Sequence, residues 1–160
     1  MPTNRRKPLP EDVRDTFKGL LGKPVAASKR APAPFDVTNS AYVTGLYVND
    51  DDELVGACVT ELALAASTGA ALALIPVVVA RESVRAGRLD AGIRENYYEA
   101  VNIMSAMLNG PTVPHLRLSE LVDGVPDEVV AMAEEEAAGH RHYDVTIVGY
   151  DGGVLALIAV

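Results

Sequence analysis

The sequence predicts a single α+β domain in which a mostly antiparallel sheet packs against helices. Strand-like segments cluster near residues 42–59 and 143–160 instead of alternating with helical segments, which indicates hairpins rather than parallel βαβ units. The chain has 160 residues, of which 49% are hydrophobic and 22% charged, so it can bury a substantial core. We expect residues 1–9 to form a disordered tail and residues 10–160 to fold as the domain.

The first third of the chain predicts one helix followed by strands. A helix is expected from Pro10 to near Gly22, because acidic residues follow the proline and an apolar stripe runs up to the glycine. A proline-rich connector then separates two strand-forming regions. The predicted elements are a short strand over 25–30, the connector 31–34, and a hairpin of 42–48 and 54–59 around the polar turn 49–53.

The rest of the chain predicts mainly helices and a closing hairpin. The expected elements are helices over 61–75, 77–86 and 90–109, a strand over 115–122, an acidic helix over 126–138, and a hairpin of 143–150 and 154–160. The helix over 90–109 is stopped by Gly110-Pro111. The apolar character of the last hairpin favours a central place in the sheet.

Charge and cysteine content exclude several classes of function. The net charge of −8 argues against nucleic-acid binding, and the short basic run Arg5-Arg6-Lys7 is interpreted as part of the solvated tail. Cys58 is the only cysteine, so no intramolecular disulfide forms, and we expect a buried, inert thiol.

The apolar stretch 61–80 contains polar residues and Pro76, which favours a buried helix over a membrane span. We expect a cytoplasmic protein without a membrane partner.

Most motifs of enzymes and metal sites are missing. The sequence contains no Walker loop, GxGxxG, GxSxG or HExxH pattern. His140 and His142 flank Arg141 in a predicted loop and lack further zinc ligands nearby, so we expect exposed turn histidines and no metal site. The acidic run 50–53 departs from the EF-hand spacing and is interpreted as a solvated hairpin tip.

One polar face of the predicted helix over 90–109 can carry chemistry. Glu95, Glu99, Asn102 and Ala106 fall on one face, beside the apolar stripe Ile93, Tyr97, Ala100, Met104 and Met107. An exposed face of an amphipathic helix explains this spacing without any function. However, the amide of Asn102 can donate and accept hydrogen bonds and so position a water. A nearby carboxylate can form an ion pair with a lysine of a partner.

The segment Tyr98-Glu99-Ala100-Val101-Asn102-Ile103-Met104-Ser105-Ala106 resembles the E-x-x-N helix of the CheX/CheC/FliY chemotaxis phosphatases. The order of elements is also similar: an N-terminal helix ending in a Leu-Leu-Gly-Lys-Pro-Val transition, a glycine-containing strand 42–48, a return strand from Leu54, an Ala-rich helix and a closing hairpin. Only one E-x-x-N motif is visible, which resembles the single-site CheX arrangement.

The resemblance implies a hydrolase of two-component signalling that acts on the aspartyl phosphate of a CheY-like response-regulator receiver domain. Asn102 would orient the attacking water and Glu99 would pair with a lysine of the regulator, as the catalytic residues. Glu95 and Ala106 would lie in the partner-binding surface. The chain would need no cofactor of its own, because the phosphorylated partner carries Mg²⁺.

Two alternatives remain open at this stage: a CheX-like interaction or scaffold protein without activity, and a small acidic adaptor unrelated to phosphorylation. Exposure of Glu99 and Asn102 side by side is required for the phosphatase and compatible with the scaffold. A homodimer is a further expected partner, because an exposed sheet edge can pair with a second copy.

Overall fold

The strands of the computed structural model form one sheet in the order β1-β5-β6-β3-β2-β4, and every neighbouring pair is antiparallel. The structure describes residue 5 and residues 7–38, 40–135 and 139–160. The strands are β1 (Val25–Arg30), β2 (Tyr42–Val48), β3 (Leu54–Glu61), β4 (Arg117–Asp123), β5 (Gly139–Ile147) and β6 (Gly153–Ala159). The predicted α+β class with an antiparallel sheet is confirmed, and the closing hairpin β5–β6 lies inside the sheet as expected.

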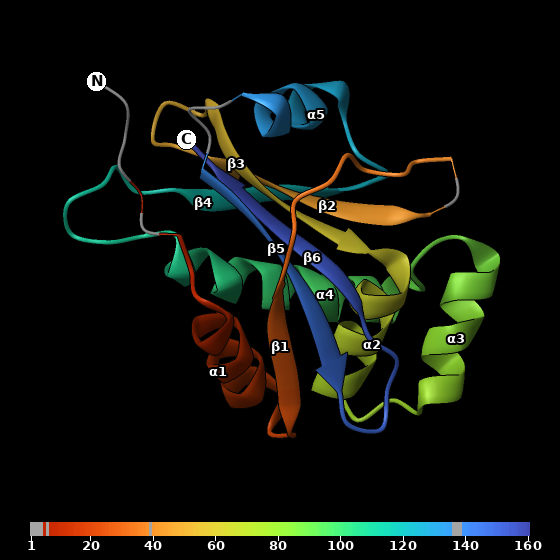
Figure 1. Ribbon diagram of the computed structural model, residues 1–160. Helices are drawn as coiled ribbons and strands as arrows, with labels where there is room; N and C mark the ends of the chain where they lie inside the picture. The colour runs from red at the N-terminus through yellow and green to blue at the C-terminus, as the bar shows by residue number, and fades with distance from the viewer. Residues whose placement is uncertain (1–4, 6, 39, 136–138) are drawn as a thin grey trace.

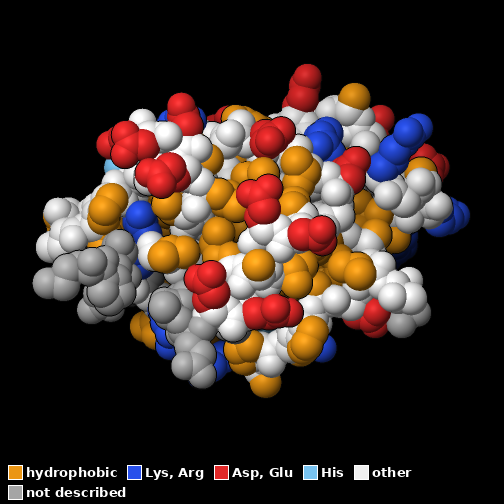
Figure 2. Space-filling view, turned by 90° about the horizontal axis from the view of Figure 1, so that it is seen from above, with side chains coloured by type: hydrophobic (Ala, Val, Ile, Leu, Met, Phe, Trp, Pro, Cys, Tyr) orange, Lys and Arg blue, Asp and Glu red, His pale blue; other side chains and the backbone are white. Residues whose placement is uncertain are grey.

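Helices cover the two faces of the sheet unequally (Figure 1). The helices are α1 (Pro10–Leu21), α2 (Leu62–Leu72), α3 (Val77–Ala86), α4 (Ala91–Met104) and α5 (Asp127–Glu134). α1, α2 and α4 lie on one face, with α3 packed on the outer side of α2, whereas α5 lies on the opposite face. Figure 2 shows the α5 side, where acidic side chains are spread between patches of hydrophobic ones.

The alternation of side chains along β3 divides the interior into two cores. Cys58 points into the larger core together with Tyr47 and the apolar faces of α1, α2 and α4. Its neighbours Ala57 and Val59 point the other way, into a smaller core with Val129 of α5. Successive residues of a strand face opposite sides of a sheet, so one apolar strand supplies both cores.

Most predicted elements are confirmed close to their expected bounds. β1 and α3 cover the expected ranges 25–30 and 77–86, and α1 ends at Gly22, whose φ of 63° is the left-handed conformation typical of a helix end. The turn 49–53 is held by Asn49, whose side-chain oxygen accepts backbone hydrogen bonds from Asp51 at 2.9 Å and Glu53 at 3.0 Å.

Three predicted ranges need correction. The helix expected over 90–109 ends at Met104, and a 3-10 turn (Ser105–Met107) follows. The Ser105 hydroxyl donates to the carbonyl of Asn102 at 2.6 Å, a local bond of the kind that competes with helical continuation. The strand expected from residue 143 begins at Gly139. The helix expected over 126–138 ends at Glu134, and residues 136–138 lie outside the described residues.

The predicted disordered tail also needs correction where the structure describes it. Arg5 is buried, and its guanidinium donates to the carbonyls of Leu108 and Val160, both at 3.1 Å. The carbonyl of Pro8 accepts a 2.5 Å hydrogen bond from the Tyr143 hydroxyl. These bonds join the segment before α1 to Leu108 after the 3-10 turn, to β5, and to Val160. Arg6, like residues 1–4, lies outside the described part.

Among the described helices, none is long and apolar enough to cross a membrane. The most apolar helix, α2, is instead buried along almost its whole length between the sheet, α3 and α4. Its alanines permit this, because small side chains let helices and strands approach closely from several sides. The predicted buried helix is therefore confirmed.

Backbone contact between α2 and α4 depends on Gly69. A Cβ atom at this position would lie 2.5 Å from the carbonyl oxygen of Ile93 in α4, closer than real atoms approach. The carbonyl of Gly69 also accepts a 3.0 Å hydrogen bond from the side chain of Asn96. A larger residue here would push α4 away from the rest of the fold.

We therefore expect Gly69→Ala to lower the free energy of unfolding by about 2–3 kcal/mol, because the added methyl group meets backbone that cannot move aside cheaply. Urea denaturation followed by circular dichroism measures this. Gly19→Ala is the matched control: it lies in α1 with nothing within 4 Å of its Cβ position. That variant should gain about 0.5–1 kcal/mol from helix propensity. Equal stability changes in the two variants would contradict the close α2–α4 contact.

Candidate functional site

The apolar stripe predicted for α4 faces the larger core. Ile93, Tyr97, Ala100 and Met104 are all fully buried. Met107, the last predicted member, lies in the 3-10 turn beyond α4 and is only partly buried against the core. The stripe therefore sets which side of α4 faces solvent.

Buried hydrogen bonds fix the rotation of α4 about its axis. The Tyr97 hydroxyl bonds to Oγ1 of Thr60 in β3 at 2.5 Å. The Tyr47 hydroxyl, from β2, donates to the carbonyl of Val101 at 2.8 Å. Burial raises the pKa of both tyrosines well above its usual range, so both hydroxyls stay protonated and available as donors. With these bonds in place, α4 cannot turn its outer face inward without leaving buried polar groups unpaired.

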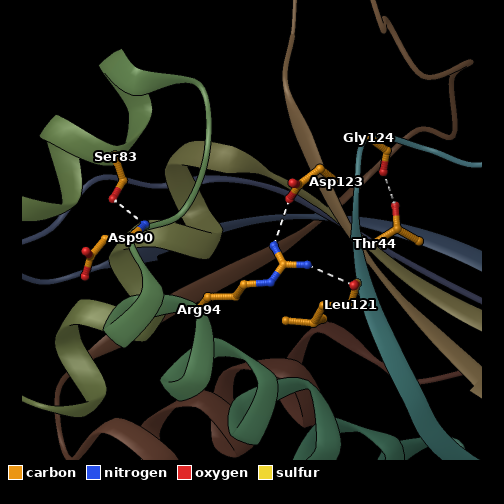
Figure 3. Close-up of polar contacts among 7 residues, drawn as sticks. All are labelled: Thr44, Ser83, Asp90, Arg94, Leu121, Asp123 and Gly124. Carbon is orange, nitrogen blue, oxygen red and sulfur yellow. Dashed lines mark hydrogen bonds and ion pairs between the residues drawn. The ribbon is translucent and has the colours of Figure 1, made fainter.

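Arg94 fastens the start of α4 to the edge strand β4 (Figure 3). Its guanidinium donates to the carboxylate of Asp123 and to the carbonyl of Leu121, both at 2.8 Å. The backbone N–H of Asp90, just before α4, donates to the Ser83 hydroxyl of α3 at 3.1 Å. The first turn of α4 is thus held between α3 and β4.

The outer face of α4 carries the predicted site residues. Glu95, Glu99 and Asn102 are all exposed, and the spacing of the three places them on successive turns. No described residue forms a side-chain hydrogen bond or ion pair with Glu99 or Asn102, since Ser105 bonds only to the backbone carbonyl of Asn102. The helix therefore presents a carboxylate and an amide side by side with their bonding capacity unused by the described residues.

Two apolar side chains flank this polar pair. Tyr98 is 39% exposed and Ile103 is 41% exposed, although both belong to the helix that builds the core. Tyrosine is among the residues enriched in protein-binding surfaces. The sequence analysis placed Tyr97 in the apolar stripe and Tyr98 outside it, but it assigned no role to Tyr98 or Ile103, because an apolar residue outside the stripe has no periodic signal of its own.

Ala106 lies apart from the helical face on which it was predicted. It is exposed in the 3-10 turn, where it lines a hollow of about 440 Å³ with Asp12, Asp15 and Thr16 of α1. The shorter α4 explains this, since the helical spacing that aligned Ala106 with Asn102 does not continue past Met104. Its predicted role in partner binding stays a prediction.

The two histidines expected in an exposed turn lie on a strand instead. His142 was expected in an exposed turn but lies on β5, is buried, and stacks on the ring of Phe35 at 5.7 Å. His140 also lies on β5. The longer strand explains both corrections.

Residues 50–53 are exposed as expected, with Asp52 paired to Arg117. Within the described part of the chain, no cluster of three or more His, Cys, Asp or Glu side chains could hold a metal ion.

Comparisons with known proteins identify the fold. No protein-family model matches the chain, and no curated protein matches it significantly in sequence. Among solved structures, Thermotoga maritima FliY has a TM-score of 0.58 at 12% identity, over 91% of this chain and 81% of that one. The FliM–SpeE complex from H. pylori gives a TM-score of 0.62 at 6% identity, over 94% and 80%. The CheX–CheY complex with BeF3 and Mg from Borrelia burgdorferi gives 0.50 at 9% identity, over 96% and 98%.

These likenesses define the class of fold to which the chain belongs. It has the α+β fold that FliY, FliM and CheX structures share, which confirms at the level of fold the resemblance predicted from the sequence. The match covers nearly the whole chain, so no large part of the structure falls outside the fold.

Cys58 provides a test of the buried core beneath α4. Burial raises the pKa of its thiol from 9.0 to about 11, and the thiol contacts the Thr60 hydroxyl at 3.6 Å. We expect native protein at pH 8 to resist alkylation by iodoacetamide, whereas urea-unfolded protein reacts fully. Mass spectrometry distinguishes the two states.

The same pKa shift has a sign that can be checked by denaturation. Because the folded thiol has the higher pKa, its contribution to stability is complete below pH 9 and is lost as pH rises from 9 towards 11. Cys58→Ala should lack this component of the pH dependence. Rapid alkylation of the native thiol at pH 8 would show that Cys58 is accessible.

Proposed function

We propose that the chain is a CheX-like phosphatase that removes phosphate from the aspartyl phosphate of a CheY-like receiver domain. The observation that carries this proposal is the exposed pair Glu99 and Asn102, one turn apart on a helix whose rotation is fixed by buried bonds. The fold supports it, because CheX is among the proteins with this fold and its solved complex contains CheY, BeF3 and Mg.

Asn102 is proposed to orient the attacking water. A side-chain amide donates through its nitrogen and accepts through its oxygen, so it can hold a water in line with the phosphorus–oxygen bond that breaks. In this reaction the water oxygen bonds to phosphorus, the aspartyl oxygen leaves as a carboxylate, and inorganic phosphate is released. The side chain of Asn102 is suited to this task because no described residue occupies its amide.

Glu99 is proposed to pair with a lysine of the receiver domain. Its carboxylate lies one turn before Asn102 and is exposed without a described partner, so it can form an ion pair that places the amide over the phosphate. Mg²⁺ would be carried by the phosphorylated partner, which leaves the chain with no cofactor of its own to bind. A phosphatase built in this way needs few residues, because the partner supplies much of the charge stabilisation.

A second candidate is a non-catalytic binding protein with the same fold. The FliM–SpeE structure favours it, because FliM, which has the same fold, is found there in a complex with another protein. Under this interpretation the α4 face binds a partner without hydrolysis. Cytoplasmic location and homodimer formation remain predictions under both candidates.

Asn102→Ala separates the two candidates. If Asn102 positions the water, this variant should bind a phosphorylated receiver domain as wild type does, while kcat for phosphate release falls by roughly 100-fold. Phosphate release from phosphorylated receiver domains of the same organism measures kcat. Unchanged kcat in Asn102→Ala would rule out this mechanism, and a wild-type chain that binds without hydrolysis would favour the binding protein.

Asn96→Ala is the matched control for this experiment. Asn96 also belongs to α4, but its amide donates to the carbonyl of Gly69 at 3.0 Å and so serves the fold. We expect its loss to reduce stability by about 1 kcal/mol and to leave kcat unchanged.

Glu99→Gln tests the docking carboxylate. Loss of its charge should raise the Kd for the phosphorylated receiver domain about tenfold, because a lysine of the partner would remain without its counter-charge in the interface. Glu128→Gln makes the same charge change on the exposed surface of α5, across the sheet, and should leave Kd unchanged. Isothermal titration calorimetry measures both. An equal effect of both substitutions would assign the change to net charge alone.

A further inference from the structure

A shallow hollow opens beside the candidate site, between α4 and the edge strand β4. Its volume is about 370 Å³. We call it the Tyr98 hollow; its lining residues are Arg94, Glu95, Tyr98, Ser119, Glu120 and Leu121. Glu95 belongs both to this hollow and to the outer face of α4, one turn before Glu99. A protein docked on Glu99 and Asn102 would therefore lie against the hollow.

The charge available in the hollow is negative. Among the described lining residues Arg94 is the only cation, and its guanidinium is already engaged by the carboxylate of Asp123 and the carbonyl of Leu121, both at 2.8 Å. Glu95 and Glu120 are exposed, and no described residue forms a hydrogen bond or ion pair with either carboxylate. Two unpaired carboxylates therefore line the same hollow from two different elements.

The remaining lining is suited to an aliphatic chain. The ring of Tyr98, 39% exposed, forms one wall, and Leu121, 8% exposed, contributes from the edge strand. A lysine or arginine side chain combines an apolar stem with a cationic head, and both heads bind favourably near an aromatic ring. An acidic side chain would be repelled here, and an apolar one would bury the carboxylates without a partner.

We propose that the Tyr98 hollow receives a lysine or arginine side chain of the receiver domain that docks on Glu99 and Asn102. This inference rests on the proposed function and extends it to the choice of partner. The basic side chain lies at the rim of the interface, away from the phosphate, so it contributes to binding and leaves the chemical step unaffected. Receiver domains that present a basic residue at this point are accepted, and those that present an acidic one are rejected.

The test compares binding with catalysis in a double variant, Glu95→Gln with Glu120→Gln. The probe is a CheY-like receiver domain of the same organism, loaded with beryllofluoride and Mg²⁺ for binding and with phosphate for turnover. Both side chains are exposed without described partners, so we expect the variant to fold as wild type does. Kd and KM should rise about tenfold, with kcat unchanged, because two exposed charge pairs are lost. The salt dependence of Kd should also weaken.

Two controls make the result specific. Glu128→Gln with Glu134→Gln changes the net charge equally on the exposed surface of α5 and should leave Kd unchanged. Tyr98→Ala should weaken binding, and Tyr98→Phe, which keeps the ring, should restore it. A rise in Kd of the same size in the α5 control would overturn the proposed role of the Tyr98 hollow, since the net charge of the protein would then explain the effect.

The outcomes separate the hollow from the proposed function. If the double variant binds the beryllofluoride-loaded domain as tightly as wild type, while Asn102→Ala loses turnover, the proposed role of the Tyr98 hollow is wrong and the proposed phosphatase activity is supported. If wild type binds the loaded domain without turnover, the proposed phosphatase activity is wrong, and the Kd of the double variant still tests the role of the Tyr98 hollow. If wild type does not bind the loaded domain, both proposals are wrong.

Discussion

Close backbone approach to α4 is the constraint on which the candidate site depends. At Gly69 a Cβ would lie 2.5 Å from the Ile93 carbonyl oxygen, and at Gly45 of β2 it would lie 2.6 Å from the Val101 side chain. These two glycines let α4 pack against α2 and the sheet at once. The buried tyrosine bonds then fix its rotation. The outer face of α4 is consequently fixed in orientation, and a helix face held in this way can place an amide at a defined position over a partner.

The distribution of charge pairing divides this region into a structural part and a part available to a partner. Arg94 is engaged with Asp123 and Leu121 and holds the helix to the edge strand (Figure 3). Glu95, Glu99 and Glu120 have no described partners, so their charge is directed to solvent. An acidic protein with its cation engaged and its carboxylates unpaired at one site is electrostatically suited to a basic surface. A motif as short as E-x-x-N is then expected, because a basic partner that carries Mg²⁺ would supply the opposite charges.

Periodicity and turn residues were sufficient to predict most elements, since apolar spacing and glycine or proline boundaries are local properties. The strand over 25–30, the helix over 77–86 and the buried stripe from Ile93 to Met104 follow from such patterns. The end of α4 could not be predicted in this way. Neither the Ser105 hydroxyl bond nor the 3-10 turn that contains Ser105 leaves a periodic pattern in the sequence. The Tyr98 hollow could not be predicted either, since it requires knowing that β4 lies at the sheet edge beside α4. His142 was misplaced because β5 begins at Gly139, which puts His142 inside the sheet and beside Phe35, a residue far away in sequence.

The most direct measurement of the central claim is the NMR signal of the Asn102 side-chain amide during titration with a receiver domain. With beryllofluoride and Mg²⁺ bound to the receiver domain, we predict large shifts of this amide and of the backbone amides from Glu95 to Ile103. The same domain without beryllofluoride should cause much smaller shifts. Shifts confined to α5, or an Asn102 amide that does not respond to the loaded domain, would contradict the account.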